Sequence, residues 1–277
     1  AASITQRGLS LQPPPRTARS TTNDLPGFVL HNAAAEHYRT KPSFVKTCLK
    51  SDPEFDDCSR EAVQHLFDAL GPGLPEIDLP ALDPLKIPKI RILQGDGPVN
   101  VNAALDDVTV TGFGHTQVLQ SQVDSKTYDF YTKLHVPKIR IEGTYDLKGK
   151  ILLIPLVGRG VCWFEPTNMT IDIISDVKLY DKDGFVFFNV TSAHVKYAIG
   201  GLKLRMNNLF DGIKSLEDST NEYLNANWRP VSESLRPILS KTIEDILLGF
   251  MQQIFHNLPA NFMVGDIKNS SPNKKKI

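Results

Sequence analysis

A long amphipathic helix pattern near the C-terminus places the strongest constraint on the fold of this chain. Between residues 231 and 258, apolar residues recur at steps that are mostly three and four, which puts them on one face of an α-helix. Such a helix would be roughly 40 Å long, well above the usual length. It needs an equally long cover, and because the preceding sequence is mostly of strand type, we expect that cover to be a sheet. The apolar positions are Val231, Leu235, Ile238, Leu239, Ile243, Ile246, Leu247, Phe250, Ile254, Phe255 and Leu258.

The central part of the chain has the alternation that is typical of β-strands. Around residues 168–179 apolar and polar residues alternate, which predicts a half-buried strand with Asn168 on its exposed face. Residues 146–149, 158–160 and 181–184 are predicted to be turns. Several candidates exceed ten residues, so we expect a long, antiparallel and strongly curved sheet, giving an α+β fold. The candidate strands are 99–113, 128–146, 150–157, 161–180 and 185–206.

Prolines and polar stretches indicate the domain boundaries. Residues 1–40 are rich in Pro, Ser, Thr, Arg and Ala and are predicted to be a flexible extension. Residues 59–70 have a helical pattern that Ser59 can cap. Residues 74–92 contain too many prolines for a central strand and are expected at an edge or rim. Pro230 fits the first turn of the long helix, and Pro237 is expected to kink it. We therefore expect one folded domain, 41–265, and a flexible lysine-rich tail, 266–277.

Charge and composition limit the classes of partner. Lysine plus arginine number 31 and aspartate plus glutamate number 31, so the net charge is zero. A nucleic-acid binder needs a strong positive field, so we expect no nucleic acid as partner. No stretch approaches the ~20 apolar residues of a transmembrane helix, so no stable membrane insertion is expected. Residues 1–20 lack the apolar core of a signal peptide.

Cysteines and glycosylation sequons favour an extracellular protein. Cys48 and Cys58 flank an acidic loop that can turn back on itself, and a disulfide there would stabilise the fold by roughly 2–3 kcal/mol. We predict this disulfide and a free Cys162, for which a buried thiol is favoured over a bond to another chain. N-x-S/T sequons, the acceptor sites for N-glycosylation, occur at Asn168, Asn189 and Asn269. Together these features predict secretion.

Motifs of catalysis are missing from the sequence. It contains no G-x-S-x-G, H-E-x-x-H, P-loop or G-x-G-x-x-G pattern. The adjacent Asp106 and Asp107 are interpreted as a bulge or turn, since neighbours in a strand point to opposite faces. Ser121, Asp124 and His115 lie close in sequence, but no nucleophile elbow surrounds the serine. We expect no enzyme, cofactor or metal, and keep a lipid esterase or epoxide hydrolase as a rival hypothesis.

Blocks of sequence in the same order resemble the insect takeout and juvenile-hormone-binding protein family. They are the cysteine pair, LPALDPLKIPKIRI at residues 79–92, YDLKGKILLIPLVGRG at residues 145–160, and LFDG followed by Asn221 and YLNANW at residues 209–228. The resemblance covers about residues 42–264. Juvenile-hormone-binding proteins have a second disulfide, for which Cys162 has no partner here, so the pattern is more similar to the takeout proteins.

The resemblance implies a tubular lipid-binding fold, in which the sheet wraps the helix and encloses an elongated apolar tunnel. On the sequence alone, a solid core is favoured instead. The tunnel suits a small hydrophobic ligand, fatty-acid-like or terpenoid, and the chain would then be a secreted carrier. A structural or receptor-facing protein without ligand is the second rival, and a receptor or second carrier protein is left open as a partner. Tyr128, Tyr131 and Tyr197 are candidates to bind the polar end of the ligand. The candidate lining residues, for which core packing is an equal alternative, are Phe130, Leu134, Val136, Leu153, Phe187, Val195, Tyr197, Leu239, Ile246, Phe250 and Ile254.

Overall fold

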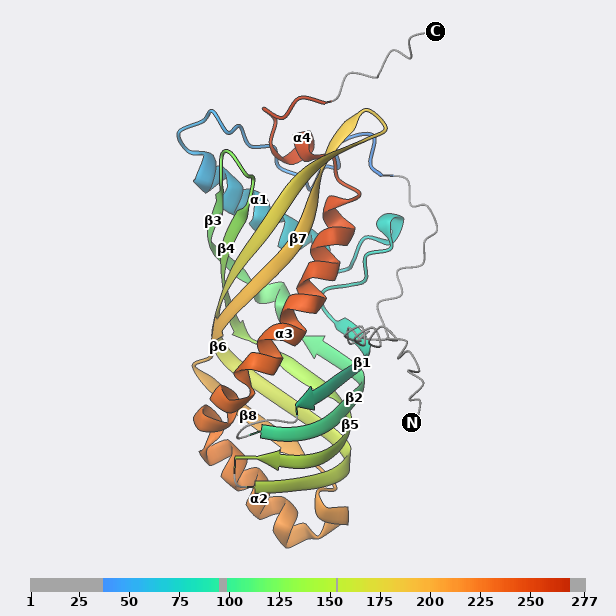
Figure 1. Ribbon diagram of the computed structural model, residues 1–277, viewed down its shortest axis with the longest axis vertical. Helices are drawn as coiled ribbons and strands as arrows, with labels where there is room; N and C mark the ends of the chain where they lie inside the picture. The colour runs from blue at the N-terminus through green and yellow to red at the C-terminus, as the bar shows by residue number, and fades with distance from the viewer. Residues whose placement is uncertain (1–36, 95–98, 153, 270–277) are drawn as a thin grey trace, which may run out of the picture.

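A computed structural model describes residues 37–94, 99–152 and 154–269 of the chain. Within these residues, eight strands form one antiparallel sheet, and the long helix α3 (Trp228–Phe255) runs along it (Figure 1). The sheet is not a closed barrel; it curves behind α3 along the long axis of the molecule. The predicted fold class, an α+β protein built from a long C-terminal helix and a long antiparallel sheet, is confirmed.

A single strand, β6 (Ile154–Lys182), is the spine of this sheet. It is 29 residues long and changes partners along its length. Its first half pairs with β5 (Arg140–Ile151) and β8 (Gly201–Met206), and its second half pairs with β4 (Phe130–Lys138) and β7 (Phe185–Ala198). Because one strand carries both halves, the two ends of the molecule share one continuous sheet.

The outer strands and shorter helices complete the two halves. β1 (Leu85–Gln94) and β2 (Val99–Thr111) extend the sheet beyond β5, and β3 (Gln117–Val123) extends it beyond β4. As expected for the proline-rich segment 74–92, β1 is an edge strand. The helix α1 (Phe55–Leu70) packs on β3, and α2 (Lys214–Ala226) packs on β8 at the lower end in Figure 1. The short elements are η1 (Pro75–Ile77), η2 (Phe113–His115), η3 (Phe210–Gly212) and α4 (Ala260–Met263).

Helix side chains bind the backbone at the free edges of three strands. Along the edge of β7, Glu244 Oε1 accepts from Val195 N–H at 2.9 Å, and Gln252 Nε2 donates to the Val190 carbonyl at 3.0 Å. Arg236 donates to the carbonyl of Tyr197 on the same edge. These side chains are spaced eight residues apart on α3, so one flank of the helix follows the strand. Unpaired strand edges are otherwise sites of aggregation.

The edges of β3 and β8 are covered in the same way. Gln64 of α1 accepts from Val118 N–H at 2.8 Å and donates to the Thr116 carbonyl at 3.0 Å. On α2, Asn221 exchanges two hydrogen bonds with Met206, and Asn225 exchanges two with Leu204. Each asparagine amide therefore replaces a missing neighbour strand. These asparagines lie in the LFDG to YLNANW block, so the block has a structural role in the fold.

Some predicted element boundaries were wrong, and glycines account for two of the errors. Residues 146–149 and 158–160 lie inside β5 and β6 and are not turns. A Cβ on Gly149 would lie 2.2 Å from Asn100 O, and one on Gly160 would lie 2.3 Å from Asn207 O. The glycines therefore permit close approach of a neighbouring backbone, which a sequence pattern does not distinguish from a turn.

Two further errors are long predicted strands that the structure divides into two. The predicted strand 128–146 is two strands, β4 and β5, and the predicted strand 185–206 is β7 and β8. The helix α1 begins at Phe55, so Ser59 is not its cap; the Ser59 hydroxyl pairs with that of Ser121 at 2.8 Å. β3 and α2 were not predicted. The turn at 181–184 is confirmed, and Asp106–Asp107 is a bulge, with Asp107 at φ 53°.

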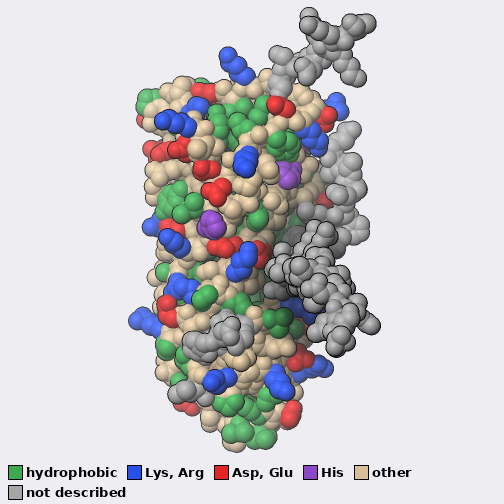
Figure 2. Space-filling model, in the orientation of Figure 1, with side chains coloured by type: hydrophobic (Ala, Val, Ile, Leu, Met, Phe, Trp, Pro, Cys, Tyr) green, Lys and Arg blue, Asp and Glu red, His purple; other side chains and the backbone are tan. Residues whose placement is uncertain are grey.

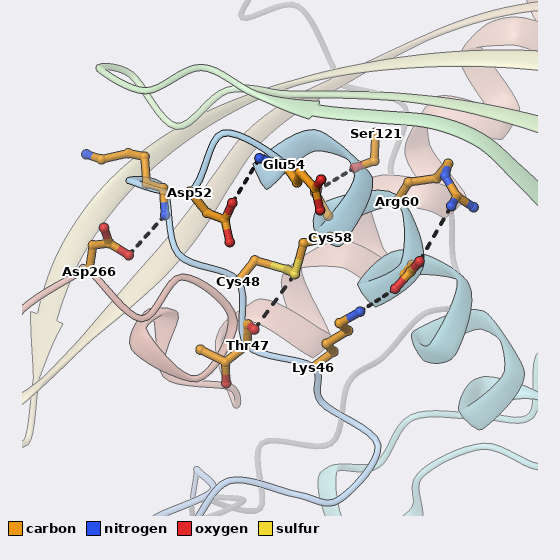
Figure 3. The surroundings of a disulfide bond; sticks show 12 residues. Lys46, Thr47, Cys48, Asp52, Glu54, Cys58, Arg60, Ser121 and Asp266 are labelled. Carbon is orange, nitrogen blue, oxygen red and sulfur yellow. Dashed lines mark hydrogen bonds and ion pairs between the residues drawn. A yellow bond between two sulfur atoms is a disulfide. The ribbon is translucent and has the colours of Figure 1, made fainter.

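The predicted disulfide between Cys48 and Cys58 is present (Figure 3). Cys162 is a free, buried thiol. The disulfide joins the first turn of α1 to a segment that pairs with the end of the domain. Cys48 N–H donates to the Met263 carbonyl at 2.8 Å, and Lys50 N–H donates to Asp266 at 2.9 Å. The cross-link therefore fixes the start of α1 to the segment that is hydrogen-bonded to the end of the described chain.

Candidate functional site

The middle of α3 has an apolar face that neighbouring side chains do not fully cover. Val231 near its start and Phe250 and Ile254 near its end are buried. Between them, every leucine and isoleucine is only partly buried, although several pack against buried clusters of the sheet. A solid core would bury such residues almost completely. These partly buried positions are Leu235, Ile238, Leu239, Ile243, Ile246, Leu247 and Leu248.

The sheet presents a matching set of partly buried apolar side chains. Leu105 of β2 packs against two separate buried clusters, and Ile171 of β6 also packs against two. Ile90 and Ile141 are partly buried beside the first of these clusters. We call the region that α3 and these four sheet residues border the apolar interior. Its walls are hydrocarbon, as a binding site for an apolar molecule requires.

The predicted lining residues fall into two groups. Leu134, Val136, Val195, Phe250 and Ile254 are buried in core clusters, and Phe187 is fully buried against the rings of His37 and Tyr180. Phe130, Leu239 and Ile246 are partly buried. Tyr197 is buried, and Leu153 lies outside the described residues. The lining role of all these residues stays a prediction, and the partly buried group fits it best.

Sequence reasoning missed the sheet side of the apolar interior. Ile141 and Ile171 alternate with polar neighbours, so the period-two pattern contained a signal for their face, whereas Leu105 follows Ala104 and has a weaker signal. Ile90 was overlooked because the prolines placed its segment at the rim. Whether an inward residue is packed or left partly uncovered depends on the distance between helix and sheet, which the sequence pattern does not give.

The three candidate tyrosines differ in their hydrogen bonds. Tyr131 Oη donates to Asp172 at 2.6 Å, and Tyr128 Oη accepts from Lys50 Nζ at 3.2 Å. The Tyr197 hydroxyl is buried and has no hydrogen-bond partner among the described residues. Burial raises the pKa of Tyr197 above its usual value, so the phenol is neutral.

Charged groups lie mainly on the outside of the fold. Figure 2 shows Lys and Arg side chains mixed with Asp and Glu over one face of the molecule, in agreement with the net charge of zero. At the β7 edge, Arg236 pairs with Glu233 one turn earlier on α3. The guanidinium carbon of Arg236 lies 5.1 Å from the ring centroid of Tyr197. Arg236 is therefore a charged side chain that contacts the Tyr197 ring.

The residues of the esterase hypothesis do not come together. The Ser121 hydroxyl pairs with Ser59, and Asp124 accepts from the N–H groups of Lys126 and Thr127 within a turn. His115 is exposed in η2. Among residues 37–94, 99–152 and 154–269, no hydrogen bond links Ser121 to His115 or Asp124. The arrangement therefore lacks the serine–histidine contact that a nucleophilic hydrolase needs.

The described residues contain neither a candidate metal site nor a candidate membrane-spanning helix. No group of three or more His, Cys, Asp or Glu side chains is arranged to hold a metal ion in this part of the chain. None of the helices in the described ranges is both long and apolar enough to span a membrane.

The chain matches a known protein family and is similar in sequence to several known proteins. Residues 27–265 match the family "Haemolymph juvenile hormone binding protein". The "Circadian clock-controlled protein daywake" of Drosophila yakuba is 24% identical over 226 residues, which are 79% of this chain and 86% of that protein. A Schistocerca gregaria protein named "Putative beta-carotene-binding protein" is 25% identical over 217 residues, 77% of this chain and 85% of that protein.

A solved structure has the same fold. The crystal structure of Epiphyas postvittana Takeout 1 superposes with a TM-score of 0.71 and 19% sequence identity. The match covers 80% of this chain and 100% of that chain.

Proposed function

Because the chain belongs to the haemolymph juvenile hormone binding protein family, we propose that it is a secreted carrier that holds one small hydrophobic ligand between α3 and the sheet. The observation that carries this proposal is the row of partly buried leucines and isoleucines along the middle of α3. A ligand that covers these side chains removes their apolar surface from water. The site would be an elongated tunnel, and the ligand a fatty-acid-like or terpenoid molecule.

Burial alone supplies enough free energy for such binding. Each buried methylene contributes about 0.8 kcal/mol, so ten methylenes contribute roughly 8 kcal/mol before the cost of association. Because the side chains that define the apolar interior are uncharged, affinity should depend little on ionic strength. The Schistocerca gregaria relative supports an apolar ligand class, since its name refers to a carotene.

Secretion and the absence of catalysis are parts of the same proposal. The disulfide Cys48–Cys58 suits an oxidising compartment, and the family name refers to haemolymph. Ser121 is held by Ser59, away from a histidine, so we infer a binding protein and not a hydrolase.

Titration of delipidated protein with a fluorescent methyl ester of a long-chain fatty acid tests the proposal. We expect saturation at one probe per chain and nearly equal affinity at low and high salt. Parallel incubation with a p-nitrophenyl ester should give no turnover above buffer. If a folded, delipidated sample binds no apolar probe with a Kd below about 100 μM, the carrier function is wrong and the protein without ligand becomes the better hypothesis.

A further inference from the structure

Tyr197 has a buried hydroxyl whose hydrogen-bonding capacity the fold leaves unused. Its side chain is on β7 and the residue is 8% exposed, and its Oη has no hydrogen-bond partner among the described residues. An unsatisfied buried hydroxyl destabilises a fold, so buried hydroxyl groups normally have a partner. The group therefore needs an explanation.

The ring of Tyr197 lies on the face of β7 that α3 covers. Val195, two residues earlier and on the same face of β7, belongs to a cluster against which Ile243 and Leu247 of α3 pack. Arg236 of α3 lies over the Tyr197 ring, with its guanidinium carbon 5.1 Å from the ring centroid. The ring thus lies between the sheet and α3, in the region proposed to hold the ligand.

Four other buried or partly buried tyrosines in the described chain have hydrogen-bond partners. Tyr145 Oη donates to the Asn207 carbonyl at 2.8 Å, and Tyr38 Oη donates to Glu76 at 2.6 Å. Tyr131 and Tyr128 bond to Asp172 and Lys50. Tyr197 carries the one tyrosine hydroxyl in the described residues that is both buried and without a hydrogen-bond partner.

The surroundings favour an uncharged ligand oxygen over a carboxylate. Arg236 is the neighbouring cation, but its guanidinium is already bound to Glu233 and to the Tyr197 carbonyl. A ligand carboxylate placed beside Tyr197 would be buried without a free counter-ion, which is costly. A neutral phenol instead donates readily to a ketone, ester, ether or epoxide oxygen.

We propose that Tyr197 is the polar anchor of the apolar interior, where its hydroxyl donates a hydrogen bond to an uncharged oxygen of an otherwise apolar ligand. This inference rests on the proposed carrier function and narrows its ligand class to neutral oxygenated molecules, in preference to free acids or pure hydrocarbons. Tyr197 would fix the position of the ligand along α3, and burial of hydrocarbon would supply most of the affinity.

A matched pair of ligands tests the anchor. Displacement of N-phenyl-1-naphthylamine by 2-heptadecanone and by heptadecane is measured for the wild type, Tyr197→Phe and the control Tyr131→Phe. Tyr131 is suitable because its hydroxyl is bound to Asp172. We expect Tyr197→Phe to weaken the ketone about 3- to 10-fold and to leave heptadecane unchanged, the size expected for one neutral hydrogen bond. The control should change neither, and Tyr197→Phe should melt no lower than the wild type.

A spectroscopic measurement keeps the test independent of affinity. With 2-heptadecanone labelled with ¹³C at its carbonyl, the bound resonance should show a hydrogen-bonded ketone in the wild type and in Tyr131→Phe, and a free ketone in Tyr197→Phe. Equal effects of Tyr197→Phe on ketone and alkane, or an unchanged carbonyl resonance, would overturn the anchor while the carrier function stands. Failure of both compounds to displace the probe from the wild type would overturn the carrier function itself.

Discussion

At the scale of single residues, the burial of His256 links stability to mildly acidic pH. His256 follows α3 and contacts the ring of Tyr180 and the side chain of Asn189. Burial, and then the charge of Lys182, lower the pKa of His256 below its ordinary 6.5. The unfolded chain therefore takes up a proton near pH 6.5 while the folded chain does not. Stability is fully present above this pH and is lost as the pH falls below it.

Replacement of His256 should remove this loss of stability. We expect the free energy of unfolding of His256→Gln to fall less than that of the wild type between about pH 7.5 and about pH 5.5. Urea denaturation at several pH values measures the slope, with His115→Gln as control because His115 is exposed. Parallel pH profiles for the wild type and His256→Gln would show that His256 is not the group responsible.

The sequons differ in how the fold presents them. Asn168 and Asn269 are exposed, whereas Asn189 is partly buried and its Oδ1 lies 3.3 Å from His256 Nε2. The partial burial of Asn189 leaves less room for a glycan on its Nδ2 atom. After expression through a secretory pathway, we expect glycan on Asn168 and little on Asn189. Glycopeptide mapping decides this, with Thr170→Ala as the variant that removes the first sequon; full occupancy at Asn189 would contradict the expectation.

At the scale of elements, Asn221 is the residue that tests whether helix amides are needed to cover the free edge of β8. This residue is 4% exposed, and its amide bonds to both the N–H and the carbonyl of Met206. Asn221→Leu has a similar volume but leaves both backbone groups unpaired. We expect a loss of roughly 2–4 kcal/mol in the free energy of unfolding. Asn227→Leu is the control, since its amide makes one exposed bond to Tyr223 and its loss should cost about 0.5 kcal/mol.

Denaturant titration of the two variants compares these costs. A similar small effect for both would mean that water satisfies the β8 edge and that α2 is not needed to cover it. Glu244 is not among the apolar positions of the α3 pattern, but its carboxylate covers the β7 edge by accepting from Val195 N–H. Glu244→Ala should therefore destabilise the fold and is not a neutral change.

Helices and strands with a strong hydrophobic period could be predicted from the sequence. Elements whose limits depend on contacts with a neighbouring segment could not. The α3 pattern spans residues 231–258 and the helix spans Trp228–Phe255, because a single apolar stripe determines both. β6 was divided in two because its glycines resemble turn residues. They are needed where the backbone of Asn207 and Asn208 crosses the strand, a contact between residues far apart in sequence.

At the scale of the whole molecule, the candidate site was predictable as a region but not residue by residue. The family resemblance located it between helix and sheet, and the alternation of Val195 and Tyr197 identified an inward face of β7. The alternation of apolar and polar residues could not distinguish Val136, which is 1% exposed, from Leu105, which is partly buried. Both are apolar strand residues, and only the spacing of the assembled elements separates a packed position from an uncovered one.

This difference between Val136 and Leu105 gives the most direct test of a hollow interior. Leu105→Trp would extend into the space between two buried clusters, so it should shorten the longest ligand accepted and cost little stability. Val136→Trp would overpack a filled position and should cost about 1–3 kcal/mol. Thermal melts and titrations with a chain-length series of 2-ketones measure both effects. A solid interior would make the two variants alike, because tryptophan would then clash at either position and ligand length would have no influence.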